Sequence, residues 1–280
     1  MSKMFASRAR RKSLAASGAA LTLAGFGATA ALADHSWNNY HWQRTTPELT
    51  IRVGDNVTNV WQTFLEDAVY GGTFGNGWNA SRYIESPIVA GSANPRNCRA
   101  LAGTIQVCNS SYGRTGWLGI ASIWVSGGHI TQGTTKLNDT YFNTAKYNTP
   151  SWRALVMCQE IGHDYGLGHQ DEDFATDNTN SCMDYTSAPQ GNETPDAHDF
   201  AQLEAIYSHT DASVQLASAA TEPPGAAASD EAGGEGPEDW GRGVQFHDNG
   251  LPFVFEKTVA PGKKVITHVF WTEERVKQHR

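Results

Sequence analysis

The sequence predicts an α+β fold for the central part of the chain, on two observations. Apolar and polar residues alternate over several short segments, as in half-buried strands, and in other segments the apolar residues recur at the three- and four-residue spacing of a helix. The strand-like segments are 49–53, 84–90, 104–108, 116–124 and 129–142, and helical spacing is found in 60–69, in the segment that begins at Pro150, and in 196–209. Strands and helices that do not alternate regularly are typical of α+β domains.

Residues 1–33 are predicted to be a signal peptide rather than part of the fold. Arg8, Arg10, Arg11 and Lys12 precede an apolar, alanine-rich stretch from Ser13 to Ala30, and Ala31-Leu32-Ala33 has the small residues of a cleavage site. The Arg10-Arg11 pair loosely resembles a twin-arginine signal, so both the Sec and the Tat export routes are open. We therefore expect a protein secreted by a bacterium, with no membrane attachment after signal cleavage.

Charge excludes some partners of the mature chain. The whole sequence has 21 basic and 29 acidic residues, and removal of the signal peptide takes away five basic residues and no acidic one. The remaining chain of about 247 residues is strongly acidic, which argues against a nucleic-acid partner or an anionic membrane surface. Its length allows one catalytic-sized domain, residues 34–211, and a small additional element. We expect a monomer, although the sequence contains no direct signal for it.

Four cysteines suit an exported protein, because disulfides persist outside the cytoplasm. Cys98 and Cys108 flank a turn with glycine, and a bridge between them would close a short loop. Cys158 and Cys182 lie beside the two segments described next, and a bridge between them would tie these segments together. Four cysteines allow three connectivities, so this pairing is a hypothesis.

The segment Cys158-Gln159-Glu160-Ile161-Gly162-His163 reads as the last part of a helix that begins at Thr149-Pro150. Threonine is a good N-cap, and proline suits the first helical position. Positions four apart lie on one helix face, so Gln159 and His163 point the same way. Gly166 can adopt the left-handed conformation that ends a helix, which would let His169 approach His163. Two imidazoles and a neighbouring carboxylate are typical of a catalytic zinc site.

This pattern resembles the metzincin metalloprotease signature H-E-x-x-H-x-x-G-x-x-H, with Gln159 in place of the first histidine. Beyond it, Ser181-Cys182-Met183-Asp184-Tyr185 resembles the Met-turn of astacins and serralysins. The resemblance covers about residues 36–210 and implies a twisted mixed sheet, a backing helix, an active-site helix, a Met-turn and a C-terminal helix. It further implies that an edge strand, for which 117–124 is the candidate, binds the substrate backbone.

The resemblance also implies a mechanism. Zn²⁺ would be held by Gln159, His163 and His169, and Glu160 would act as general base and then pass its proton to the leaving amine. Tyr185 would stabilise the oxyanion. We therefore expect a secreted zinc-dependent endopeptidase with polypeptide substrates.

Gln159 leaves three alternatives open, because an amide oxygen is a weaker zinc ligand than an imidazole nitrogen. Gln159 binds the metal in a weakened site, or a residue from elsewhere completes the site with His163 and His169, or the site holds no metal. In the last case the protein would be a pseudoprotease that binds a polypeptide or a cell-wall polymer. A different metal-dependent hydrolase on the same scaffold is a further alternative.

The loop after His169 is acidic and offers a second candidate metal. Its carboxylates are those of Asp171, Glu172, Asp173 and Asp177. A Ca²⁺ site is conceivable there, but the spacing matches no EF-hand loop, which favours a solvated loop.

The remainder of the chain divides in two. Residues 212–239 are rich in Ala, Gly, Pro and Glu, a composition that predicts a flexible linker. Residues 240–280 contain three strand-like segments, 243–247, 253–257 and 265–271, separated by turns with glycine. This small β element is too short to be very stable alone, so we expect it to pack on the catalytic domain or to bind a surface or carbohydrate.

Overall fold

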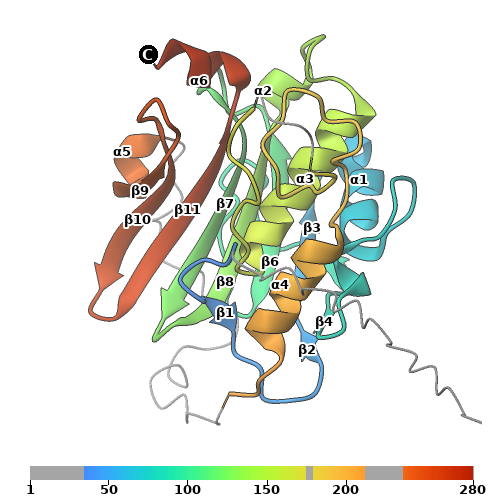
Figure 1. The fold of residues 1–280 in the computed structure, drawn as a ribbon, viewed down its shortest axis with the longest axis vertical. Helices are drawn as coiled ribbons and strands as arrows, with labels where there is room; N and C mark the ends of the chain where they lie inside the picture. The colour runs from blue at the N-terminus through green and yellow to red at the C-terminus, as the bar shows by residue number, and fades with distance from the viewer. Residues whose placement is uncertain (1–34, 175–178, 212–235, 280) are drawn as a thin grey trace, which may run out of the picture. The chain divides into compact units, whose positions relative to one another are not determined.

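A computed structural model of the protein describes residues 35–174, 179–211 and 236–279. The predicted signal peptide, most of the predicted linker and Asp177 lie outside these residues. The described chain has the predicted α+β architecture, a mixed sheet with helices packed against it (Figure 1).

The main sheet has a parallel and an antiparallel half. Its strands in spatial order are β5 (Ile88–Ala90), β3 (Arg52–Asn56), β6 (Thr104–Ser110), β8 (His129–Asn138), β7 (Trp117–Ser126), β11 (Lys263–Trp271), β10 (Pro252–Ala260) and β9 (Arg242–Phe246). Pairing is parallel from β5 to β8 and antiparallel from β8 to β9. The short β1 (His41–Trp42) pairs in parallel with the first residues of β8, and β2 (Leu49–Thr50) pairs with β4 (Ile84–Glu85) in a separate small sheet.

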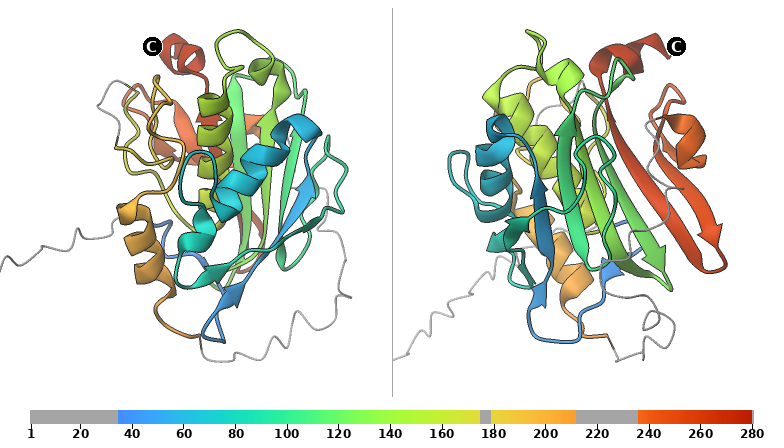
Figure 2. Two further views of the ribbon diagram at one scale, coloured as in Figure 1. Left: turned by 90° about the vertical axis from the view of Figure 1, so that its right-hand side faces the viewer. Right: turned by 180° about the vertical axis from the view of Figure 1, so that it is seen from behind.

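Helices α1 (Asn59–Tyr70) and α3 (Pro150–Asp164) pack together on one face of the sheet (Figure 2), and α3 contacts β7, β8 and β11. α4 (Ala197–Tyr207) follows the Met-turn segment. Four shorter helical segments are η1 (Trp78–Ala80), α2 (Asp139–Phe142), α5 (Pro237–Trp240) and α6 (Glu273–Gln278). Every residue of α3 from Trp152 to Asp164 is buried, so this helix lies at the centre of the hydrophobic core.

Local sequence signals account for the helix ends. The Thr149 side chain accepts a hydrogen bond from the N–H of Trp152, and Pro150 occupies the first turn, as predicted. The predicted strand 129–142 ends earlier, at Asn138, because the Asn138 side chain caps α2 by accepting the N–H of Thr140.

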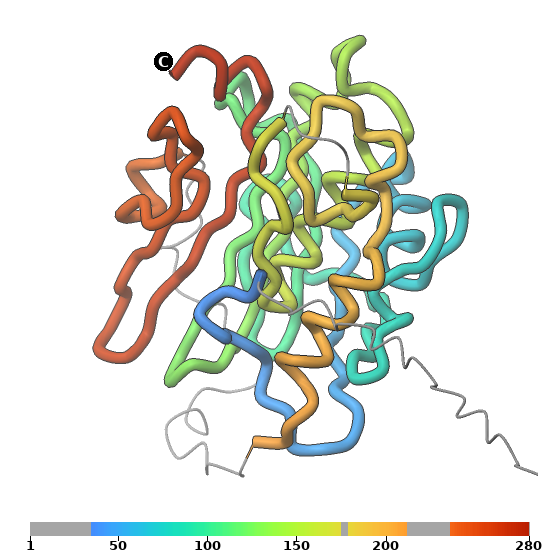
Figure 3. The backbone as a smooth tube through the Cα atoms, viewed as in Figure 1, coloured from blue at the N-terminus to red at the C-terminus, as the bar shows by residue number. Residues whose placement is uncertain are grey.

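The C-terminal strands cover residues 117–124, which the resemblance implied to be an edge strand. β11 pairs with the whole length of β7, from Lys263 opposite Ser126 to Trp271 opposite Trp117, and β10 and β9 extend the sheet further (Figure 3). The expectation that 117–124 is an exposed edge strand is therefore wrong. The physical reason is that β11 supplies the hydrogen-bond partners that the backbone of β7 would otherwise offer to a substrate.

Candidate metal centre

The end of α3 brings His163 and His169 together. Gly166 has φ of +95°, and a Cβ there would lie 2.2 Å from the carbonyl oxygen of Tyr40, so only glycine fits the turn. After this turn His169 Nε2 lies 3.0 Å from His163 Nε2. The Nδ1 of His163 lies 2.8 Å from the carbonyl oxygen of Leu167, to which it can only donate. The lone pair of His163 is therefore on Nε2 and points towards His169.

A third imidazole comes from β11. One ring nitrogen each of His163, His169 and His268 lie within 4.8 Å of one another. The ring of His268 stacks on that of His163, with centroids 3.6 Å apart. Neither ring nitrogen of His268, nor Nδ1 of His169, has a hydrogen-bond partner among the described residues. Unpaired buried nitrogens are costly, and a metal ion would bind one nitrogen of each ring.

Electrostatics keeps these imidazoles neutral. Burial lowers the pKa of His163 to about 3 and the pKa values of His169 and His268 well below the usual 6.5, and the neighbouring histidines lower the last two further. A neutral imidazole is the form that binds metals. The three histidines could therefore hold a metal ion, and three imidazoles are a ligand set that zinc accepts.

The amide of Gln159 is hydrogen-bonded to the Met-turn. Its Nε2 donates to the carbonyl oxygens of Cys182 and Asp184, at 2.8 and 3.0 Å. Its Oε1 is buried and has no hydrogen-bond partner among the described residues. One end of the side chain thus supports the turn, while the oxygen stays available to a metal.

The Glu160 side chain lies against β7, the strand that pairs with β11, in which His268 lies. A Cβ on Gly119 would lie 2.4 Å from Glu160 Oε1, so glycine makes room for the carboxyl group. The backbone of Ala121, which pairs with His268 across β7 and β11, also interacts with it. Burial and, secondarily, the nearby Asp164 carboxyl raise the pKa of Glu160 well above its usual value. A carboxyl group with a raised pKa suits proton transfer.

The segment 181–185, which resembles a Met-turn, packs against α3. A Cβ on Gly162 would lie 2.5 Å from the sulfur of Met183, which shows how closely the turn packs on the helix. The Cys158–Cys182 disulfide joins the same two elements, and Cys98–Cys108 closes the other loop, so the hypothesised pairing is confirmed. Two disulfides indicate an oxidising, extracellular environment. None of the helices in the described ranges has the length and apolar character needed to cross a membrane.

Tyr185 packs on the site but its hydroxyl is directed to β11. The ring lies edge-on to His169, with centroids 4.6 Å apart, and the hydroxyl donates to the carbonyl oxygen of Val269 at 2.6 Å. Burial raises its pKa well above 10. In this conformation Tyr185 fastens β11 in place, so an oxyanion role would require that β11 move.

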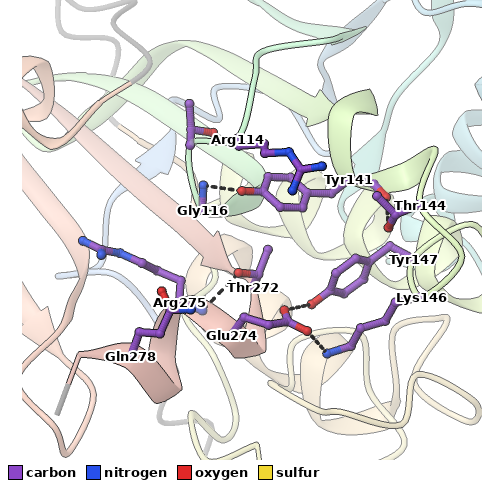
Figure 4. A pocket seen from close by; sticks show the side chains of 11 residues that line it. Arg114, Gly116, Tyr141, Thr144, Lys146, Tyr147, Thr272, Glu274, Arg275 and Gln278 are labelled. Atoms are coloured by element: carbon purple, nitrogen blue, oxygen red, sulfur yellow. Dashed lines mark hydrogen bonds and ion pairs between the residues drawn. The ribbon is translucent and has the colours of Figure 1, made fainter.

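The centre is closed to solvent. Gln159, Glu160 and His268 are 0% exposed, His163 is 1% exposed and His169 is 7% exposed. A surface pocket of about 450 Å³ lies elsewhere, between α6 and the segments around Arg114 and Lys146, and none of the residues of the centre lines it (Figure 4). Beside this pocket Lys146 pairs with Glu273 and Glu274, and Tyr147 donates to Glu274. These contacts attach α6 to the segment around Lys146.

His268 is the residue of the centre that the sequence did not indicate. It lies in an apolar stretch, Val265-Ile266-Thr267-His268-Val269, which was assigned to a separate element. A histidine inside a buried strand is the only local signal, and nothing nearby in the sequence connects it to His163.

Comparison of the sequence with protein-family models gives no match, and comparison with curated proteins gives none either. The site must therefore be judged on its geometry.

Proposed function

We propose that the protein is a secreted zinc-dependent endopeptidase that is latent in the conformation described. One observation carries the proposal: three buried, neutral imidazoles converge, and a buried glutamate lies one helical turn before the first of them on α3. His163, His169 and His268 would hold the metal, with Gln159 Oε1 as a fourth ligand. Bound zinc would supply a Lewis acid for the peptide carbonyl and a lowered pKa for water.

The residues of the chain would perform the proton transfers. The Glu160 carboxylate would accept a proton from the attacking water and then give it to the leaving amine, which restores the carboxylate. The backbone of β7 would bind the extended substrate, once its hydrogen-bonding groups are released from β11.

Latency follows from the ligand count. A catalytic zinc site needs an open position, whereas four protein ligands close it. If β11 moves away, His268 leaves with it, and the same movement frees the edge of β7 and the hydroxyl of Tyr185. One displacement would therefore open the metal, the substrate strand and the oxyanion position together.

A non-catalytic metal-binding protein is the second candidate. The observation that favours it is the continuous pairing of β11 with β7, which leaves Glu160 without access to any substrate. In that case the metal would be structural, and His268 would be a permanent ligand.

The test uses the secreted chain with a protease recognition site inserted within residues 212–235. We expect about one zinc at this centre, negligible peptide cleavage before nicking, and cleavage of a mixed peptide library after nicking and release of the C-terminal fragment. Glu160→Gln should keep the zinc and abolish cleavage. His268→Ala should weaken zinc binding in the intact chain, and His247→Ala, a nearby hairpin histidine outside the cluster, should not.

The outcomes separate the candidates. Zinc binding without cleavage, even after the C-terminal fragment has dissociated, supports the non-catalytic protein. No zinc at His163 and His169 under any condition contradicts both candidates.

A further inference from the structure

A second cluster of metal-binding side chains lies where β1, the start of β8 and the end of α4 meet. The Nε2 atoms of His41, His129 and His209 each lie 3.3 Å from Oδ1 of Asp211. The ligand atoms of His41, His209 and Asp211 are all within 4.8 Å of one another. The cluster shares no residue with the centre described above and plays no part in the proposed function.

The hydrogen bonds of His41 direct its lone pair to this point. Its Nδ1 lies 2.8 Å from the carbonyl oxygen of Asn39, so that nitrogen carries the hydrogen. A neutral His41 then turns the lone pair of Nε2 towards an oxygen of Asp211. A protonated His41 donates Nε2–H to this oxygen, whereas a neutral His41 places two acceptors 3.3 Å apart, which a metal cation between or beside them would satisfy.

The carboxylate is held in place by the backbone. Its Oδ2 accepts the N–H of Arg44 at 2.7 Å, and the N–H of Asp211 donates to the carbonyl oxygen of Arg44 at 2.7 Å. The Arg44 guanidinium in turn donates to the carbonyl oxygen of His209. A ligand that is itself hydrogen-bonded is typical of metal sites, because the outer partners orient the inner ones.

Three imidazole nitrogens converge on a single carboxylate oxygen, which is more than hydrogen bonding alone explains. A carboxylate oxygen has two lone-pair directions, so three ring N–H groups cannot all reach it with good geometry. The parallel pairing of β1 with β8 places His41 opposite His129, and Figure 1 shows β1 next to the start of β8. The side chains of His129 and His209 are 27% and 46% exposed, so an ion can enter from solvent.

We propose that His41, His209 and Asp211 form the core of a second metal site, for a divalent transition metal such as zinc. His129, whose Nε2 lies 3.3 Å from Asp211 Oδ1 but outside this set of mutually close ligand atoms, would complete the site after a rotation of its side chain. Imidazole nitrogen and carboxylate oxygen are both ligands that zinc binds, and four of them would complete a tetrahedral shell. The bound ion would join the β1 segment, the β7–β8 turn and the end of α4, and would stabilise the fold by binding only the folded state.

The experiment measures zinc per chain by mass spectrometry of the metal, using the full secreted protein after chelation and dialysis against micromolar zinc. We expect close to two zinc ions per chain for the wild type and about one for both His209→Ala and His163→Ala. His279→Ala, the same substitution at an exposed histidine outside both clusters, should keep two. Zinc should raise the Tm of His163→Ala but have less effect on the Tm of a variant that combines His163→Ala and His209→Ala.

The outcomes are distinct for the two sites. Equal zinc content in the wild type and His209→Ala contradicts the second site, whatever the central histidines do. If His163→Ala retains all the zinc and His209→Ala loses it, the second site stands and the metal of the proposed function fails.

Discussion

The surroundings of the Gln159 side chain differ at its two ends. The amide nitrogen donates to two backbone carbonyls of the Met-turn, and the amide oxygen has no hydrogen-bond partner among the described residues. A histidine could not make both of these donations and still present a lone pair to a metal. Under the proposed function, glutamine at this position supports the turn at the expense of metal affinity, and His268 would supply the third imidazole.

Substitutions at Gln159 test the separate roles of its amide nitrogen and its amide oxygen. Gln159→Ala should lower the free energy of unfolding by about 1–3 kcal/mol, because the carbonyls of Cys182 and Asp184 lose their buried donor. Gln159→His should raise zinc affinity if the oxygen is a ligand, since imidazole is the better donor to zinc. Chemical denaturation of the metal-free proteins and zinc titration measure the two effects. Unchanged or weaker zinc binding by Gln159→His would mean that Gln159 is not a ligand.

Some residues of the candidate centre could be predicted from the sequence and others could not. The approach of His169 to His163 follows from their short spacing and from the local turn chemistry around Gly166, whereas the Cys158–Cys182 pairing is one of three connectivities that the sequence allows. His268 could not be predicted, because its place beside His163 depends on the register of β11 against β7, and these strands are far apart in the sequence. Register is set by packing of the completed sheet, which no local pattern specifies.

At the scale of elements, the Met-turn is fixed to α3 by a disulfide, by Gln159 and by close packing on Gly162. Its Asp184 adds a titratable group. Burial raises the pKa of Asp184 from 3.8 to about 6, although the N–H of Thr179 and the amide of Asn192 oppose this shift by donating to the carboxylate. The turn should therefore respond to pH.

The sign of this response follows from the raised pKa. The folded state holds the proton of Asp184 more firmly than the unfolded state, so the stabilising contribution is complete below pH 3.8 and is lost as the pH rises through about 6. The free energy of unfolding of the wild type, measured relative to Asp184→Asn, should fall by about 1 kcal/mol between pH 4 and pH 7, after allowance for solvent screening.

Asp184→Asn is a suitable reference, because Oδ1 has no hydrogen-bond partner among the described residues and Oδ2 accepts both donors. An amide nitrogen can replace Oδ1 without loss of a bond. Urea denaturation of the metal-free proteins at several pH values gives the difference. A wild-type curve parallel to that of Asp184→Asn would show that Asp184 does not titrate in this range.

At the scale of the whole molecule, the C-terminal strands are part of the main sheet and belong to the same compact unit as the rest of the described chain. The sequence predicted three strands there but not their place, since a short β element can complete any exposed edge. This placement closes the candidate centre, because β11 covers the edge of β7 and brings His268 next to His163 and His169. Under the proposed function, activity at the centre therefore depends on whether β11 can leave.

A covalent lock between β7 and β11 tests that dependence. Ser122 and Thr267 are cross-strand partners, with their hydroxyl oxygens 3.0 Å apart in the buried sheet, so cysteines at both positions are placed to form a disulfide. We expect the oxidised Ser122→Cys/Thr267→Cys protein to keep its zinc and to remain inactive towards peptides after nicking within 212–235. The Ser122→Ala/Thr267→Ala protein should become active after nicking. Non-reducing electrophoresis confirms the lock, because the nicked fragments stay joined. If the locked protein cleaves peptides as fast as its alanine counterpart, the substrate reaches the metal without movement of β11, and latency through this strand is wrong.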